Sequence, residues 1–291
     1  MDVARLRVLV EVAHAGSIAA AAQRMSFTPS ALSQQLAKLE REVGSALLDR
    51  GPTGVRLTSA GEVLVQHGER VIGELRDAEV AVAAAAGRAP QRLAIGTFAT
   101  AGKTLVPRAL AALRRRHPAA DLSLLDLEPP AGYGLVTSRD LDVLITHRYP
   151  GVALPDAAGL HRQRLLLDRL RLTMPAGHPR AGSRNRLADL AGDQWISSAR
   201  GVANRTCLQT LAGDLALHVA YETTDYEVIL ELVAAGLGIA LVPASILASR
   251  RDNRIAVGDL VGTRAAREVH LVHRKRPTPL VADFIDLLQP K

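Results

Sequence analysis

The segment from residue 28 to residue 38 places polar side chains at a spacing that could read DNA. Leu32, Leu36 and Leu39 recur at helical spacing, which predicts a helix with one apolar stripe and one polar face. Serine and glutamine can hydrogen-bond to base edges in the major groove, and lysine neutralises phosphates. The polar face carries Thr28, Pro29, Ser30, Ser33, Gln34, Gln35 and Lys38. From periodicity alone, an ordinary surface helix with a solvated face remains the alternative.

A second segment, Gly96 to Thr104, nearly matches the motif of a phosphate-binding loop. That loop has four residues between its first glycine and Gly-Lys-Thr, whereas here Thr97 to Ala101 supply five. The longer loop would not close its amides around phosphates, so an NTPase is the disfavoured alternative. The same turn precedes a predicted helix, and amides and hydroxyls at a helix N-terminus suit an anion.

Other chemistry is not indicated by the sequence. The nine histidines are scattered, and we find no metal-ligand spacing, nucleophile elbow or dinucleotide fingerprint. We therefore expect no enzyme activity, no cofactor and no metal. Cys207 is the only cysteine, so no internal disulfide can form and a reducing cytoplasm is expected. Charged residues among the first 15 exclude a signal peptide, and no apolar run is long enough to span a membrane.

The charge distribution does not by itself indicate DNA binding. The net charge is +7, and residues 92–291, with 26 basic and 19 acidic side chains, carry all of this excess. A basic C-terminal region fits an anionic ligand. A general arginine and alanine bias of the source genome is the alternative.

The first 58 residues are predicted to form three helices and a two-stranded wing. Residues 3–14 carry an apolar stripe, Ser17 is placed to cap a helix over 18–25, and Thr28 to cap the third. The third helix should bury Val43 with its leucines and end at Gly44. Residues 47–50 and 55–58 flank a Gly-Pro-Thr-Gly turn and predict the wing.

One long helix is predicted over residues 59–88, followed by a linker at 87–90. Its apolar residues alternate spacings of four and three, a heptad seam that a second copy of the chain should cover. The seam consists of Leu64, Gly68, Val71, Leu75, Ala78, Val82 and Ala85.

From residue 92 onward, strand and helix patterns alternate, which predicts an α/β region with mostly parallel strands. Strands are expected at 92–96, 121–127, 141–146, 165–174 and 239–242, and helices at 104–116 and 226–234.

Residues 1–61 resemble the signature of the LysR family of bacterial transcriptional regulators. The matching pieces are Gly16-Ser17, Ala20-Ala21, the run Thr28 to Leu36, Leu39-Glu40, Val43-Gly44, Leu47 to Arg50, and Leu57 to Gly61. Leu48 stands where the family usually has phenylalanine. Residues 92–291 are more loosely similar to the family's effector domain, through Leu93 to Gly96, Leu105 to Pro107, Arg116 to Pro118, Leu141 to Val143, and Ala234 to Pro243.

The resemblance implies three parts: a winged helix-turn-helix (1–58), a linker and dimerisation helix (59–88), and a two-lobed α/β effector domain like a periplasmic binding protein (92–291). Lobe I is expected at 92–161 and 265–291 and lobe II at 162–264, with crossings near His161 and Ala265. The implied DNA contacts are the polar face above with Ser17, Arg50 and Arg56. The implied dimer contacts are Leu64, Val71, Leu75, Ala78 and Val82.

By the same resemblance, Thr97, Thr100, Ala101 and Gly102 occupy positions that grip an effector carboxylate. From the facing lobe, Arg200 and Val202 are the expected partners, and Thr146 and His147 are expected to end a strand facing the cleft. Plain helix capping, a solvated loop arginine and a surface histidine are the respective alternatives. Peroxide-sensing members of the family use a cysteine pair, which this chain lacks, so Cys207 is expected to be a buried structural thiol.

The chain is therefore interpreted as a cytoplasmic regulator that binds an interrupted palindrome as a homodimer or homotetramer. A small effector, expected to be anionic, would change lobe closure and hence subunit spacing on DNA. RNA polymerase is a candidate further partner. A periplasmic-type binding protein is the remaining alternative, which residues 1–58 and the absent signal peptide contradict.

Overall fold

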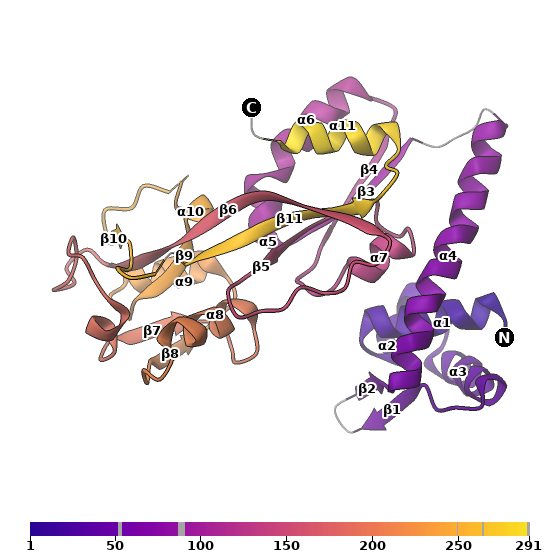
Figure 1. The fold of residues 1–291 in the computed structure, drawn as a ribbon, viewed down its shortest axis with the longest axis horizontal. Coiled ribbons are helices and arrows are strands. Elements are labelled where there is room, and N and C mark those ends of the chain that lie inside the picture. The colour runs from indigo at the N-terminus through magenta and orange to yellow at the C-terminus, as the bar shows by residue number, and fades with distance from the viewer. Residues whose placement is uncertain (52–53, 87–90, 249, 264, 290–291) are drawn as a thin grey trace.

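A computed structural model describes residues 1–51, 54–86, 91–248, 250–263 and 265–289 (Figure 1). The N-terminal part holds three helices and a two-stranded antiparallel wing: α1 (Val3–Ala15), α2 (Ile18–Met25), α3 (Pro29–Val43), β1 (Leu48–Gly51) and β2 (Gly54–Leu57). Ser17 and Thr28 cap α2 and α3 as predicted, and Gly44 ends α3 in the left-handed conformation. Pro52 and Thr53 of the predicted turn lie outside the described residues.

The core of this unit is the leucine stripe of α3, packed against α1 and α2. Leu32, Leu36 and Leu39 are fully buried, but Val43 is 40% exposed, so its predicted burial was wrong. Val43 is the last residue of α3, directly before the left-handed cap Gly44. The Glu40 carboxylate accepts hydrogen bonds from the amide nitrogens of Leu47 (2.8 Å) and Leu48 (3.3 Å), which fixes the entry to the wing.

The long helix α4 (Ser59–Ala85) leaves the wing and packs against α1. Gly61 lies so close to the carbonyl group of Leu47 that any side chain there would clash. A side chain at Gly68 would stand 2.9 Å from a methyl group of Val10, so Gly68 faces α1 and does not belong to the heptad seam. The predicted end of the helix, 87–88, lies outside the described residues.

The C-terminal region is built on a seven-stranded sheet with neighbours in the order β10-β6-β11-β5-β3-β4, and β9 also pairs with β6. Its strands are β3 (Arg92–Thr97), β4 (Asp121–Asp126), β5 (Val143–Arg148), β6 (Leu160–Pro175), β9 (Ala240–Pro243), β10 (Ile255–Gly258) and β11 (Ala266–Arg274). Only β3 with β4 and β3 with β5 are parallel pairs within it; the other described pairs are antiparallel. The expectation of mostly parallel strands was therefore wrong.

Two long antiparallel strands, β6 and β11, run side by side along this region and link its two lobes (Figure 1). Lobe I is the part around β3, β4 and β5, with α5 (Ala99–Thr104), α6 (Val106–Arg116), α7 (Tyr133–Thr137) and α11 (Pro279–Leu288). Lobe II adds to β9 and β10 the elements β7 (Gln194–Ser197), β8 (His218–Glu222), η1 (Leu187–Leu190), α8 (Ala203–Ala212), α9 (Tyr226–Ala234) and α10 (Ala244–Leu247).

Two further expectations differ from the structure. The crossing expected near His161 comes later, because β6 pairs with β11 as far as Arg169 and only from Leu170 with β9. The helix expected to open at Thr104 begins instead at Ala99 and is interrupted before α6. Pro107 has no amide hydrogen to continue the helical hydrogen-bond ladder.

Candidate functional site

The polar face of α3 is presented to solvent. Ser30, Gln34, Gln35 and Lys38 are exposed, and Ser33 is half-buried. The Thr28 hydroxyl oxygen accepts the Ala31 amide hydrogen (3.2 Å) and lies 3.0 Å from the Ser30 hydroxyl oxygen. Thr28 and Pro29 thus set the start of α3. The polar side chains that follow them do not take part in the hydrophobic core.

The wing strands carry two basic residues of the predicted DNA contacts. Arg56 is exposed on β2, and Arg50 lies in β1 opposite Val55. Ser17 caps α2 by accepting the Ala20 amide hydrogen at 3.1 Å. An exposed recognition helix with a capped bracing helix and a basic wing is the arrangement that a helix-turn-helix needs to enter a major groove.

Four of the five predicted dimer residues are exposed on α4. Val71 and Leu75 are each 42% exposed, Val82 is 68% exposed, and Ala78 is also exposed. Leu64 is half-buried because it lies nearer the winged-helix core. An apolar stripe without cover within one chain is a surface that another chain can bury.

An aromatic cluster lies where the two lobes meet. The His147 ring meets the Phe98 ring edge-on at 4.5 Å between centroids and the Tyr149 ring at 5.1 Å. The Arg267 guanidinium carbon lies 5.2 Å from the Phe98 ring centroid and 6.0 Å from that of Tyr149. Burial lowers the pKa of His147 and raises the pKa of Tyr149, so both rings are held neutral near pH 7.

Arg267 forms a buried ion pair with Asp168, its cross-strand partner on β6. Two guanidinium nitrogens donate to one carboxylate oxygen of Asp168 at 2.9 and 3.1 Å. Ser245 of α10 donates to the same carboxylate from its hydroxyl (2.6 Å) and its amide (3.0 Å). The pair therefore joins both crossing strands to lobe II and to the aromatic cluster of lobe I.

Side chains from the two lobes also touch directly. The Tyr149 and Tyr226 hydroxyl oxygens are 2.7 Å apart, and Lys103 of α5 forms an ion pair with Glu227 of α9. A cavity of about 10 Å³ lies at this junction, lined by Tyr149, Leu170, Ile196, Ser197, Asn204, Leu208, Ile229 and Leu241. It has room for about one water molecule. The lobes are thus close together here.

The predicted effector residues do not all come together. Thr97 and Ala101 are buried and Thr100 and Gly102 half-buried, and the Gly102 amide hydrogen is already donated to the Phe98 carbonyl oxygen at 2.9 Å. Thr146 pairs across the sheet with His270 and His147 with Val269, so their side chains lie on opposite faces of β5. The expectation that both face one cleft was wrong.

In lobe II, Arg200 and Val202 lie in the exposed turn between β7 and α8, close in sequence to Ser197 of the small cavity. Cys207 is buried on α8, and its burial raises the pKa of the thiol to about 12. A thiol with that pKa is almost entirely protonated near neutral pH and is not a reactive nucleophile.

Sequence reasoning missed most residues of the inter-lobe cluster, namely Phe98, Tyr149, Asp168, Asn204, Tyr226, Ser245 and Arg267. A signal existed for the ion pair. Asp168 follows Leu165, Leu166 and Leu167 in one apolar strand, and a charged residue inside such a run is usually paired when buried.

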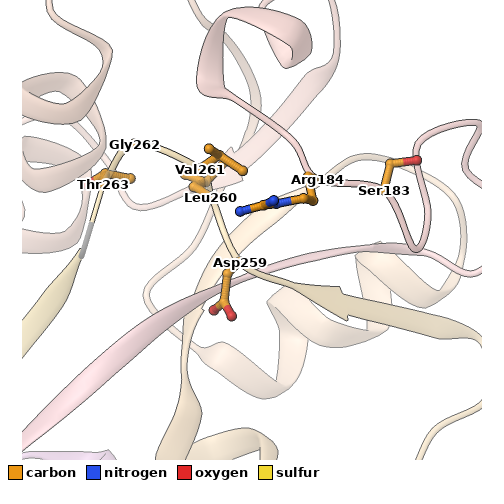
Figure 2. A pocket seen from close by; sticks show the side chains of 7 residues that line it. All are labelled: Ser183, Arg184, Asp259, Leu260, Val261, Gly262 and Thr263. Atoms are coloured by element: carbon orange, nitrogen blue, oxygen red, sulfur yellow. The ribbon is translucent and has the colours of Figure 1, made fainter.

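A larger pocket of about 570 Å³ lies on lobe II, away from these residues (Figure 2). Ser183 and Arg184 face it from one segment and Asp259 to Thr263 from another. It shares no lining residue with the inter-lobe cavity.

The described residues hold neither a candidate metal site nor a helix that could span a membrane. Their histidine, cysteine, aspartate and glutamate side chains form no group of three or more that could hold a metal ion. None of their helices is both long and apolar enough to cross a membrane.

The fold and these surfaces define a winged-helix DNA-binding protein with a two-lobed sensor domain. Residues 3–62 match the family model described as "Bacterial regulatory helix-turn-helix protein, lysR family", and residues 86–291 match "LysR substrate binding domain". The chain belongs to the LysR family of transcriptional regulators.

Individual relatives agree with this assignment. The chain is 31% identical to the HTH-type transcriptional regulator CbbR of Xanthobacter flavus, over 98% of this chain and 86% of CbbR. The crystal structure of CbnR, a LysR family transcriptional regulator, is 27% identical with a TM-score of 0.54, covering 99% of this chain and 100% of CbnR. Full-length CbnR complexed with its target DNA is 25% identical with a TM-score of 0.54, covering 99% and 98%. These relatives are regulators and not enzymes, which excludes the NTPase alternative.

Proposed function

We propose that this regulator reads an interrupted palindrome in duplex DNA through the polar face of α3. The observation that carries the proposal is the exposure of Ser30, Gln34, Gln35 and Lys38 on a helix whose opposite face carries the fully buried Leu32, Leu36 and Leu39. Arg50 and Arg56 on the wing would contact the phosphate backbone. A DNA target would put the protein in the bacterial cytoplasm.

The test is binding to DNA from around its own gene, followed by fluorescence anisotropy and footprinting. We expect Gln34→Ala to weaken specific binding by about 1–3 kcal/mol, the usual value of a good base contact. Gln66→Ala, at an exposed position of α4, is the matched control and should bind as the unsubstituted protein does. Equal protection of the same site by both variants would exclude Gln34 from base recognition.

We propose three parts for the chain: residues 1–58, 59–88 and 92–291, the last divided into lobes where β6 changes partners. The exposed stripe Val71, Leu75, Ala78 and Val82 would pair with a second copy to form a homodimer, which can assemble further into a tetramer. A dimer presents two recognition helices, as a palindromic site requires. RNA polymerase is the further partner that we propose for activation.

We propose that the effector is a small anion held between the lobes, with Thr100 at the start of α5 on one side and Arg200 on the other. Lys103 and Arg267 are already paired with carboxylates, whereas Arg200 is exposed and makes no ion pair among the described residues. The inter-lobe cavity is too small for such a ligand, so binding would move the lobes apart. That movement would change the spacing of the DNA-binding domains.

A panel of small carboxylates and amino acids, assayed by thermal shift, would identify the ligand class. For whichever compound binds, we expect Thr100→Val and Arg200→Ala each to lose about 1–3 kcal/mol of affinity by calorimetry. Arg184→Ala in the lobe II surface pocket is the control. Loss of affinity in Arg184→Ala with none in the other two would place the ligand in that pocket instead.

A further inference from the structure

The helix α4 rests on lobe I of its own chain over a short, closely fitted surface. Its contact is with α7 and with the residues that follow α7 up to Asp140. Gly73 of α4 lies against the carbonyl oxygen of Thr137, and any side chain at Gly73 would clash there. Ile72, beside it, is buried in the hydrophobic core of the winged-helix unit. The two backbones approach this closely only because residue 73 is glycine.

Two ion pairs of opposite direction lie across this contact. The Arg76 guanidinium of α4 lies 2.6 Å from the Asp140 carboxylate and donates to the Ser138 carbonyl oxygen at 2.7 Å. Asp77 of α4 pairs with Arg139 from lobe I. Burial lowers the pKa of Arg139 to about 10, so its side chain still carries its charge near neutral pH. Each side thus offers one arginine and one aspartate to the other.

The winged helix takes part in the same contact. His14 of α1 lies 2.8 Å from the Glu69 carboxylate of α4, and both side chains meet lobe I at Gly134. Any side chain at Gly134 would collide with both. The DNA-binding domain is therefore held through α1 as well as through α4.

The lobe I side of the contact connects to the strand that crosses between the lobes. Arg274, the last residue of β11, donates to the carbonyl oxygens of Val136 (3.4 Å) and Leu141 (3.2 Å) and to the Asp142 carboxylate (2.8 Å). The opposite end of β11 carries Arg267 of the inter-lobe ion pair. One strand thus spans from the lobe junction to the segment on which α4 rests (Figure 1).

We propose that residues 133–140 of lobe I form a docking surface for α4 of the same chain, which sets the orientation of the winged helix on the sensor domain. The heptad seam lies on another side of α4, since Val71 and Leu75 are turned well away from Arg76 and Asp77 at 100° per residue. Dimer pairing and docking are therefore compatible. The docking itself does not depend on the proposed function. Only the regulatory role of the orientation rests on it.

The ion pairs of the docking contact are weak enough to be broken. The four charged side chains of its ion pairs are between 24% and 39% exposed. Ion pairs at such exposure are weak and are screened by salt. Lobe movement that shifts β11 would displace the 136–142 segment and with it the docked helix.

The first test is chemical cross-linking without DNA or effector, so that its outcome does not depend on the proposed function. In Asp77→Cys, Arg139→Cys, which keeps the Arg76 contacts, a short bismaleimide should join the two new thiols. Cys207 will not compete because it is buried and its pKa is raised. We expect a product with the mass of one chain on denaturing gels. A product of doubled mass, or none, would overturn docking within the chain.

The second test asks whether the charges hold the contact. Adding Arg76→Ala to the cross-linking variant should slow the reaction about two- to fivefold, the effect of losing an ion pair this exposed. Arg70→Ala, an exposed arginine on the same helix, should leave it unchanged. In the otherwise unsubstituted chain, Arg76→Asp should increase the radius of gyration measured by solution scattering, and Arg76→Asp with Asp140→Arg should restore it. A radius unchanged by the single reversal, or not restored by the double, would refute the proposal.

Discussion

Replacing Arg267 by methionine should destabilise the sensor domain more than any change at an exposed ion pair. The side chains of Arg267 and Asp168 are only 2% and 3% exposed, and two guanidinium nitrogens contact the same carboxylate oxygen. In Arg267→Met the carboxylate stays buried with only Ser245 as a donor. Removing one partner of such a pair costs about 3–5 kcal/mol, because the remaining charge is uncompensated.

The assay is urea unfolding at one fixed protein concentration, since a dimer's stability depends on concentration. Trp195 is the only tryptophan and is fully buried in lobe II, so its fluorescence reports on the sensor domain. With a denaturant slope of about 2–3 kcal/mol per molar urea, the midpoint of Arg267→Met should fall by about 1–2 M.

The matched control lies on the same sheet. Arg148 pairs with Glu268 of β11 at 2.9 Å, but these side chains are 41% and 23% exposed. Arg148→Met should cost about 1 kcal/mol or less. A second variant, Arg267→Met with Asp168→Asn, should recover at least about 2 kcal/mol because no lone charge is left buried. The reasoning is refuted if Arg267→Met costs no more than Arg148→Met, or if the double variant recovers nothing.

Three further outcomes are expected. Arg56→Ala should lower the salt dependence of DNA binding by roughly one unit of slope if Arg56 touches phosphate; an unaltered slope would place it off the backbone. Val71→Glu with Leu75→Glu should dissociate the dimer in sedimentation, whereas Val80→Glu, on the opposite side of α4, should not; a tight dimer in the double variant would contradict the seam. Burial lowers the pKa of His147 below its unfolded value, so the unfolded chain takes up protons first and stability falls as pH drops below about 6.5. Between pH 7 and pH 5.5, the free energy of unfolding of His147→Gln should fall by up to about 1.4 kcal/mol less per pH unit than that of the unsubstituted protein. Urea midpoints at the two pH values measure this difference, and an equal fall in both proteins would show that His147 is not the cause.

The N-terminal domain could be predicted almost completely from the sequence. Ser17 and Thr28 each satisfy amides within three residues, and the leucine stripe of α3 follows from a period of 3.6. These interactions are local, so the spacing of residue types is enough to specify them. The predictions for Val43 and Gly68 were wrong because each depends on which neighbouring helix covers the position. The spacing of residue types carries no information about that neighbour.

In the sensor domain, strand direction and the facing of side chains could not be predicted from the sequence. Local patterns placed most of its strands, but they could not show that β11 runs antiparallel to both β5 and β6, because direction depends on the partner strand. Adjacent positions such as Thr146 and His147 point to opposite faces, and only the assembled sheet shows which face meets the other lobe.

The sequence alone thus determined the helix-turn-helix, its caps and its polar face, because contacts a few residues apart create them. The tertiary structure alone decided the pairing of Arg267 with Asp168 and the seating of Gly73 against Thr137, each between residues more than sixty positions apart. A buried charge or a bare glycine indicates that some partner exists. Which partner it meets depends on how the whole chain folds back on itself.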